Sequence, residues 1–215
     1  SVVSWSPDGS RLAFYRMDQS MVSSYPLVHT NTRKATEEKL YYPMAGMPSH
    51  HVTLGIYDVA SGKTTYIKTG EPKEKYLTNI SWAPDSKTVY IAEVSREQNH
   101  MDLKAYDPAT GDYIKTLFSE HNDKYIEPQW PMRFIPGRDK EFVWQTRRDG
   151  YTHLYRYNVD GKLLGQITRG EWEITDFLGF ADGGKTIVYS STQLSPIDRV
   201  IASVSIDGRK TRILT

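Results

Sequence analysis

A glycine turn closes the β-rich run Ile56-Tyr57-Asp58-Val59-Ala60-Ser61-Gly62-Lys63, and the same pattern returns three times farther along the chain. The turn glycines of the four copies are Gly62, Gly111, Gly161 and Gly208, which stand 49, 50 and 47 residues apart. A repeat of about fifty residues built from short strands is typical of the blades of a β-propeller. The 215-residue chain is therefore predicted to be an array of similar units.

Each copy also contains a second turn nearer its start. In the first copy this turn is Trp5-Ser6-Pro7-Asp8-Gly9, and in the second it is Trp82-Ala83-Pro84-Asp85-Ser86. Proline presets the backbone of an early turn position and glycine accepts a positive φ at a later one, so this pattern before a β-rich run predicts a hairpin. Pro136-Gly137 and Asp182-Gly183 mark the turn in the third and fourth copies. Two hairpins per copy make a four-stranded antiparallel blade.

These turns divide the chain into four predicted blades. Their approximate bounds are residues 1–70, 74–119, 125–168 and 171–215. The predicted fold class is all-β, a β-propeller of four-stranded antiparallel blades. Four blades lie at the low end of what closes by radial repetition, so the unit either closes alone or forms part of a larger ring.

The composition agrees with an all-β globular body and excludes several other classes. Hydrophobic residues make up 38% of the chain, aromatic residues 12%, and the net charge is only +1, which argues against a disordered chain and against nucleic acid as a partner. No apolar run approaches the roughly eighteen residues of a membrane-spanning helix, so no membrane segment is expected. The chain has no cysteine, which excludes disulfides, thiolate metal sites and a cysteine nucleophile.

The first copy is longer than the others. The spacing from the upstream turn to the downstream glycine is 25 residues in the second and fourth copies but 53 in the first, which leaves about 28 extra residues within the range 17–51. Long ordered insertions in compact folds are usually functional. Apolar stretches flank a charged run, a composition that resembles an interface core with a polar rim. We expect an extended arm that binds a partner, and a mobile surface loop is the alternative.

The titratable residues form no recognisable catalytic or metal-binding motif. The histidines, among them His50, His51 and His153, lack metal-ligand spacing, so we expect neither a metal nor a cofactor. Glu171 and Glu173 share one face of a predicted strand, whereas a glycosidase needs carboxylates opposed across a cleft. No Gly-x-Ser-x-Gly motif occurs, so no nucleophile elbow can be placed. We therefore predict that the chain has no catalytic residue and is inactive alone.

Several segments resemble the propeller of the dipeptidyl peptidase IV family of serine exopeptidases. The matching runs within the insertion and its flanks are residues 16–19, 25–27, 42–46 and 52–54. In the third blade the run Arg148-Asp149-Gly150-Tyr151-Thr152-His153-Leu154-Tyr155 and the following residues 167–174 are similar to that family in motif and spacing. The matches keep their order across essentially the whole chain.

The resemblance implies more than the chain contains. Family members have an eight-bladed N-terminal propeller that caps a C-terminal α/β-hydrolase domain, and they release N-terminal dipeptides, typically after proline or alanine. This chain would supply about four consecutive blades of the ring, without the hydrolase domain and without the paired glutamates that hold the substrate's free amine. The propeller would exclude and position peptide substrates, and a serine triad in the other domain would perform the chemistry.

Residue-level roles also follow from the resemblance. The run Arg133-Phe134-Ile135-Pro136 is similar to an Arg-Phe-Arg-Pro segment that faces the central cavity of the family's propeller. The resemblance implies that Phe134 and Arg133 are substrate-cavity residues, while Ile135 replaces the second arginine. In the alternative interpretation, Phe134 is a turn aromatic like Trp82 that packs between blades.

In this family the insertion of the corresponding blade protrudes and helps to form a homodimer. The resemblance therefore implies a homodimer through the arm within residues 17–51. The candidate interface residues are Tyr25, Leu27, Tyr41, Tyr42 and Met44.

The family also suggests a compartment and leaves two other functions open. A cysteine-free member indicates a bacterial periplasmic or cell-surface enzyme, since the vertebrate ectodomains are disulfide-bonded. One alternative function is a free-standing periplasmic scaffold or interaction propeller. The other is a carbohydrate-active propeller enzyme, which the arm does not favour and for which no acid/base pair is assembled.

Overall fold

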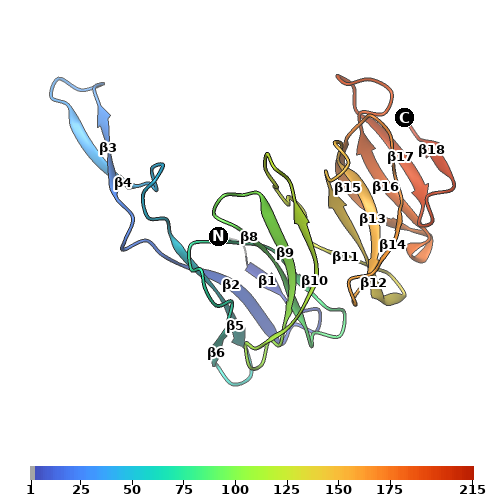
Figure 1. The fold of residues 1–215 in the computed structure, drawn as a ribbon, viewed down its shortest axis with the longest axis horizontal. Coiled ribbons are helices and arrows are strands. Elements are labelled where there is room, and N and C mark those ends of the chain that lie inside the picture. Colours follow the sequence, from blue (N-terminus) through green and yellow to red (C-terminus); the bar gives the residue numbers. More distant parts are fainter. Residues whose placement is uncertain (1–2) are drawn as a thin grey trace.

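The computed structural model describes residues 3–215, which consist almost entirely of β-strands (Figure 1). Four separate four-stranded sheets and one two-stranded sheet account for all of the strands in this range. Within each four-stranded sheet the strands are antiparallel and lie side by side in chain order. The predicted fold of four-stranded antiparallel blades is confirmed. Residues 1 and 2 of the predicted first blade lie outside the described residues.

The strand bounds are as follows. The first blade contains β1 (Val3–Trp5), β2 (Arg11–Asp18), β5 (His51–Asp58) and β6 (Thr64–Tyr66). The second contains β7 (Tyr76–Trp82), β8 (Val89–Val94), β9 (His100–Tyr106) and β10 (Tyr113–His121). The third contains β11 (Arg133–Ile135), β12 (Arg138–Thr146), β13 (His153–Asn158) and β14 (Leu163–Gln166). The fourth contains β15 (Ile174–Ala181), β16 (Thr186–Ser191), β17 (Val200–Ser205) and β18 (Thr211–Ile213), with a 3-10 turn η1 (Asp182–Gly184) between its first two strands.

The proline-containing turn of the first blade shows why its sequence pattern forms a hairpin. Gly9 has φ +70°, which a residue without a Cβ adopts freely, and its N–H donates to the Ser6 carbonyl at 2.9 Å. The Asp8 carboxylate accepts a hydrogen bond from the Ser6 hydroxyl at 2.6 Å and from the Ser10 N–H at 3.0 Å. These bonds hold the pKa of the Asp8 carboxyl well below its usual range.

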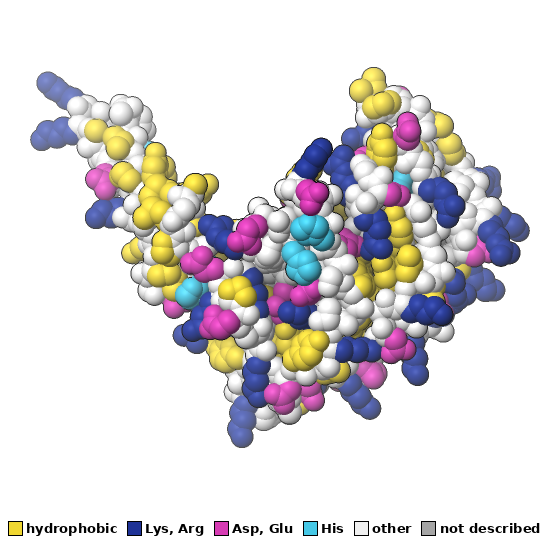
Figure 2. Space-filling view, in the orientation of Figure 1, with side chains coloured by type: hydrophobic (Ala, Val, Ile, Leu, Met, Phe, Trp, Pro, Cys, Tyr) yellow, Lys and Arg dark blue, Asp and Glu magenta, His cyan; other side chains and the backbone are white. Residues whose placement is uncertain are grey.

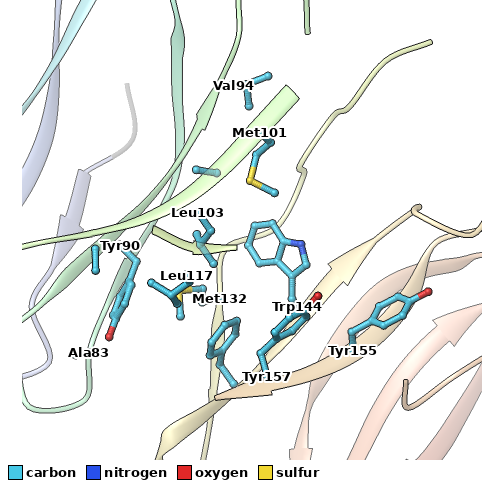
Figure 3. Packing of buried hydrophobic residues seen from close by; sticks show 13 residues of the cluster. Ala83, Tyr90, Val94, Met101, Leu103, Leu117, Met132, Trp144, Tyr155 and Tyr157 are labelled. Atoms are coloured by element: carbon cyan, nitrogen blue, oxygen red, sulfur yellow. The ribbon is translucent and has the colours of Figure 1, made fainter. Parts of the chain in front are cut away.

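The hydrophobic core lies between the blades. The interface of the first two blades contains Leu54, Ile56, Trp82 and Ile91 among its buried residues. Figure 3 shows the next interface, where Met101 and Leu103 of the second blade pack against Trp144 and Tyr157 of the third. Val143, Leu154, Ile187 and Tyr189 are buried between the third and fourth blades. Because Val143 and Trp144 are neighbours on β12, side-chain alternation lets one strand face both adjoining blades.

The repeated turn glycines allow neighbouring blades to approach closely. A Cβ atom at Gly161 would lie 1.8 Å from the Leu117 carbonyl oxygen on the outer strand of the second blade. A Cβ atom at Gly111 would lie 2.3 Å from the Tyr66 carbonyl oxygen of the first blade. The repeat that is visible in the sequence therefore marks the points where one blade docks against the preceding one.

Candidate functional site

The insertion in the first blade forms a hairpin that projects away from the four blades (Figure 1). It lies between β2 and β5 and consists of β3 (Ser24–His29) and β4 (Thr36–Tyr41), which pair antiparallel with Tyr25 opposite Leu40. The charged run between the two strands forms the tip. Every residue of both strands is exposed, so the arm has no core of its own.

Apolar side chains gather along the arm (Figure 2). Tyr25 is 47% exposed, Tyr41 48% and Tyr42 56%, while Leu27 is at 37% and Met44 is half-buried. A run of exposed aromatic and aliphatic side chains on one projection is typical of an interaction surface. The interface role of these five residues stays a prediction.

The base of the arm is anchored to the blades. Val22 is buried, and the N–H of Tyr42 donates to the Ser23 carbonyl at 3.0 Å. Ser49, also buried, donates its N–H to the Glu74 carboxylate at 3.1 Å. The arm therefore leaves the first blade from an ordered base.

Phe134 lies on β11, the first strand of the third blade, and packs toward the second blade. Its half-buried ring is 5.8 Å from the Tyr90 ring and 6.1 Å from the Phe142 ring, measured between centroids. This packing favours the interpretation of Phe134 as a turn aromatic between blades. A contact between its remaining exposed surface and substrate stays a prediction.

Arg133 points the other way, toward the fourth blade. Its guanidinium carbon lies 4.5 Å from the centroid of the Phe177 ring on β15, in a cation–π arrangement. Desolvation lowers the pKa of Arg133, and its Nε has no hydrogen-bond partner within residues 3–215. A partly buried guanidinium with an unused donor can bind an anion or a carbonyl oxygen.

A polar cluster that the sequence did not reveal lies between the second and third blades. The Glu120 carboxylate accepts hydrogen bonds from Trp144 Nε1 at 3.2 Å and from the Thr146 hydroxyl at 2.7 Å, and it pairs with Arg148. The Arg148 guanidinium lies 4.6 Å from the centroid of the Tyr155 ring. Burial lowers the pKa of Arg148, but the Glu120 carboxylate outweighs this effect and the net shift is upward.

This cluster forms the floor of a cavity of about 420 Å³. One wall is the connection between β10 and β11, and the other is the end of β12 with the turn that follows it. In the sequence, Arg148 was notable only as part of the run 148–155 that resembles the family. That resemblance assigned no chemical role to Arg148. The partnership with Glu120 could not be found from spacing, because the two residues belong to different blades.

His153 has a structural role. It is fully buried, its Nδ1 lies 3.1 Å from the Thr168 hydroxyl and its Nε2 lies 2.9 Å from the Gly170 carbonyl oxygen. Both ring nitrogens are thus occupied, and the ring edge packs on Trp172. Across the described residues no group of three or more metal-ligating side chains is assembled, and no helix there is long and apolar enough to cross a membrane.

The whole chain matches one family model. That model describes the dipeptidyl peptidase IV (DPP IV) N-terminal region, and the match covers residues 1–215.

Two solved structures share this architecture. A candidate dipeptidyl aminopeptidase IV from Bacteroides ovatus superposes with a TM-score of 0.89 at 39% identity, over 97% of this chain and 32% of that one. Porphyromonas gingivalis dipeptidyl peptidase 4 superposes with a TM-score of 0.86 at 26% identity, over 100% of this chain and 30% of that one.

Curated relatives give the same picture at the level of sequence. A candidate dipeptidyl-aminopeptidase B from Pyrenophora tritici-repentis is 29% identical over 96% of this chain. Another, from Tuber melanosporum, is 29% identical over 100% of it. The chain spans about a quarter of the length of these relatives, since it covers 26% of each.

Proposed function

Because the chain belongs to the family of dipeptidyl peptidase IV N-terminal regions, we propose that it is the non-catalytic propeller portion of a serine exopeptidase that removes dipeptides from the N-termini of peptides. The observation that carries the proposal is the family match over residues 1–215 together with the four-stranded blades. In the parent enzyme these blades are part of an eight-bladed ring.

The propeller acts by exclusion and positioning. The serine triad of the hydrolase domain performs the acyl transfer, and no residue of this chain makes or breaks a bond. A ring of blades admits slim, extended peptides to that site and keeps folded proteins out. Holding the substrate in a reactive orientation contributes to rate because it removes the entropic cost of an encounter.

Arg133 and Phe134 contribute to the substrate cavity. Two features support this role for Arg133: it lies on the first strand of its blade, and its Nε donor has no partner within residues 3–215. The guanidinium would donate to a carbonyl or carboxylate oxygen of an extended substrate. Phe134 would offer the part of its ring that the Tyr90 and Phe142 contacts leave exposed.

The arm joins two copies of the parent enzyme into a homodimer. The exposed aromatic and aliphatic side chains of its two strands support this role, since an isolated two-stranded hairpin is marginally stable in water. Burying these side chains against a second copy would stabilise both the arm and the dimer. We place the enzyme in the periplasm or at the cell surface.

An activity measurement on the parent protein tests the proposal. We expect release of p-nitroaniline from Gly-Pro-p-nitroanilide, no release from its N-acetylated counterpart, and loss of activity after treatment with a serine-directed fluorophosphonate. The 215-residue chain alone should release nothing. If the parent protein cleaves neither substrate, the peptidase assignment fails and a scaffold propeller becomes the better explanation.

A further inference from the structure

The connection between the second and third blades presents one unpaired edge of its backbone. The chain runs without a turn or bend over residues 125–129. The Ile126 N–H donates to the Gln98 carbonyl, and the Pro128 carbonyl accepts a hydrogen bond from the Asn79 amide at 2.9 Å. Both contacts point toward the second blade and fix the segment there.

The two residues that alternate with these contacts in the sequence, Glu127 and Gln129, line the neighbouring cavity. Within residues 3–215 the N–H groups of Glu127 and Gln129 have no partner.

Two aromatic rings flank this edge and line the cavity of about 420 Å³. Tyr125 is 53% exposed and Trp130 is half-buried. In the described part of the chain neither ring packs on another aromatic ring, whereas most of the buried rings are paired. A cavity of this size with exposed aromatic walls is suited to a small ligand or a short chain segment.

The charges in the cavity favour an uncharged ligand. On the floor, Glu120 and Arg148 neutralise each other. On the wall formed by the connection, Lys124 and Glu127 have opposite charges, and Arg147, which also lines the cavity, pairs with Glu173 at 3.2 Å. Neither a strongly anionic nor a strongly cationic ligand would gain a net attraction here.

We infer that this cavity binds an extended peptide segment by strand addition. The peptide pairs its backbone with the free edge at Glu127 and Gln129, and an apolar side chain of the peptide lies between Tyr125 and Trp130. Main-chain hydrogen bonds supply affinity in this mode of recognition, and pockets for alternate side chains supply selectivity. The fixed position of the edge limits the entropy lost on binding. The inference rests on the proposed function only in naming peptides as the ligand.

A direct binding experiment tests the inference. The probe is a ten-residue peptide of alternating leucine and threonine, acetylated at its N-terminus so that an exopeptidase cannot shorten it, with a fluorophore on a C-terminal lysine. We expect a saturable rise in fluorescence anisotropy with the wild-type chain and with the parent protein. A Gly-Ser peptide of equal length should bind at least tenfold more weakly.

Two variants of equal chemistry locate the site. Tyr125→Ala should weaken binding at least tenfold, while Tyr113→Ala, which removes an equally exposed tyrosine (53%) from β10, should leave it unchanged. Gln129→Pro should abolish binding because it removes one free N–H donor. Circular dichroism and the melting temperature verify that each variant is folded.

Modified probes test the pairing without altering the protein. N-methylation of the peptide amides that face the edge should abolish binding, and methylation of the alternate amides should have little effect. Any one of three results would overturn the inference. The two methylation patterns could have equal effects, Tyr125→Ala and Tyr113→Ala could have equal effects, or the peptide could fail to bind at millimolar protein. Binding of cellohexaose with no binding of the peptide would assign the site to carbohydrate instead. Failure here leaves the p-nitroanilide activity intact, so the two proposals fail separately.

Discussion

The four blades and the arm are both built from antiparallel strand pairs, yet they differ in what covers them. On the blades, the strands bury aromatic pairs such as Phe142 and Tyr157 of the third blade, whose ring centroids are 5.8 Å apart and which pack in the core shared with the second blade. On the arm, the opposed residues Tyr25 and Leu40 are both exposed. Strand pairing alone is marginal in water, so the blades derive stability from packing within the chain. The exposed strands of the arm require packing contacts from outside the described chain.

This difference separates two kinds of substitution. Changes between the blades should lower the free energy of unfolding, and changes on the arm should alter association with little effect on stability.

The first prediction concerns the buried tryptophan between the second and third blades. Trp144→Ala should lower the free energy of unfolding by about 3–5 kcal/mol, because it leaves a cavity and removes a hydrogen bond to Glu120. Trp5→Ala makes the same chemical change at a site that is 58% exposed and should cost far less. Guanidinium unfolding of both variants measures the difference. Equal losses would contradict the account of the blade core.

The second prediction concerns the approach of one blade to the next. Gly161→Ala should destabilise the chain by about 2–4 kcal/mol, because the new Cβ would overlap the Leu117 carbonyl oxygen at a positive φ. Gly62→Ala shares the positive φ, but the nearest atom to its Cβ is 3.9 Å away, so only about 1 kcal/mol is expected. Urea unfolding of the two variants isolates the cost of the close approach. A cost at Gly161 no greater than at Gly62 would refute it.

The third prediction concerns the ion pair on the cavity floor. Arg148→Met should cost about 2 kcal/mol, because it leaves the largely buried Glu120 carboxylate without its cation. Arg147→Met removes the neighbouring arginine, which is 58% exposed and pairs with Glu173, and should change stability by less than about 0.5 kcal/mol. Thermal unfolding at low and moderate salt compares the two. If both variants have the stability of the wild type, the Glu120–Arg148 ion pair does not stabilise the chain.

The fourth prediction concerns acid stability through the turn carboxylate Asp8. Its pKa is lower in the folded chain than in the unfolded chain because the Ser6 hydroxyl and the Ser10 N–H bond the ionised form. The resulting stabilisation is complete above the unfolded pKa of about 4 and is lost as pH falls through the lower folded pKa. Asp8→Asn should therefore flatten the fall in melting temperature between pH 5 and pH 2. An Asp139→Asn variant makes the same charge change at another exposed position and serves as the reference for the slope.

The sequence was sufficient for the parts of the fold that local chemistry determines. The turn glycines and the proline-containing turns predicted four-stranded blades because each turn requires particular backbone angles at particular residues. Counting residues between Gly9 and Gly62 located the insertion, and its apolar flanks predicted an extended arm. The resemblance carried by the run from Arg148 to Tyr155 is confirmed by the family match over the whole chain.

The candidate sites were less accessible because they depend on contacts between blades. Glu120 and Trp144 meet only when β10 and β12 are brought together, and nothing in their spacing indicates this. Phe134 had two interpretations from the sequence, and its packing on Tyr90 depends on the same interface. The unpaired edge near Gln129 was also unpredictable, since it follows from which backbone groups the second blade occupies.

The most direct test of the contrast between blades and arm is the solution mass of two proteins by multi-angle light scattering. One is the wild-type chain, and the other has residues 24–41 replaced by a short Gly-Ser linker, which removes both exposed strands and keeps the buried residues Val22 and Ser49. We predict a dimer for the wild type and a folded monomer for the variant. A variant that keeps the dimer mass would show that the copies associate through the blades, and the role of the arm would be wrong.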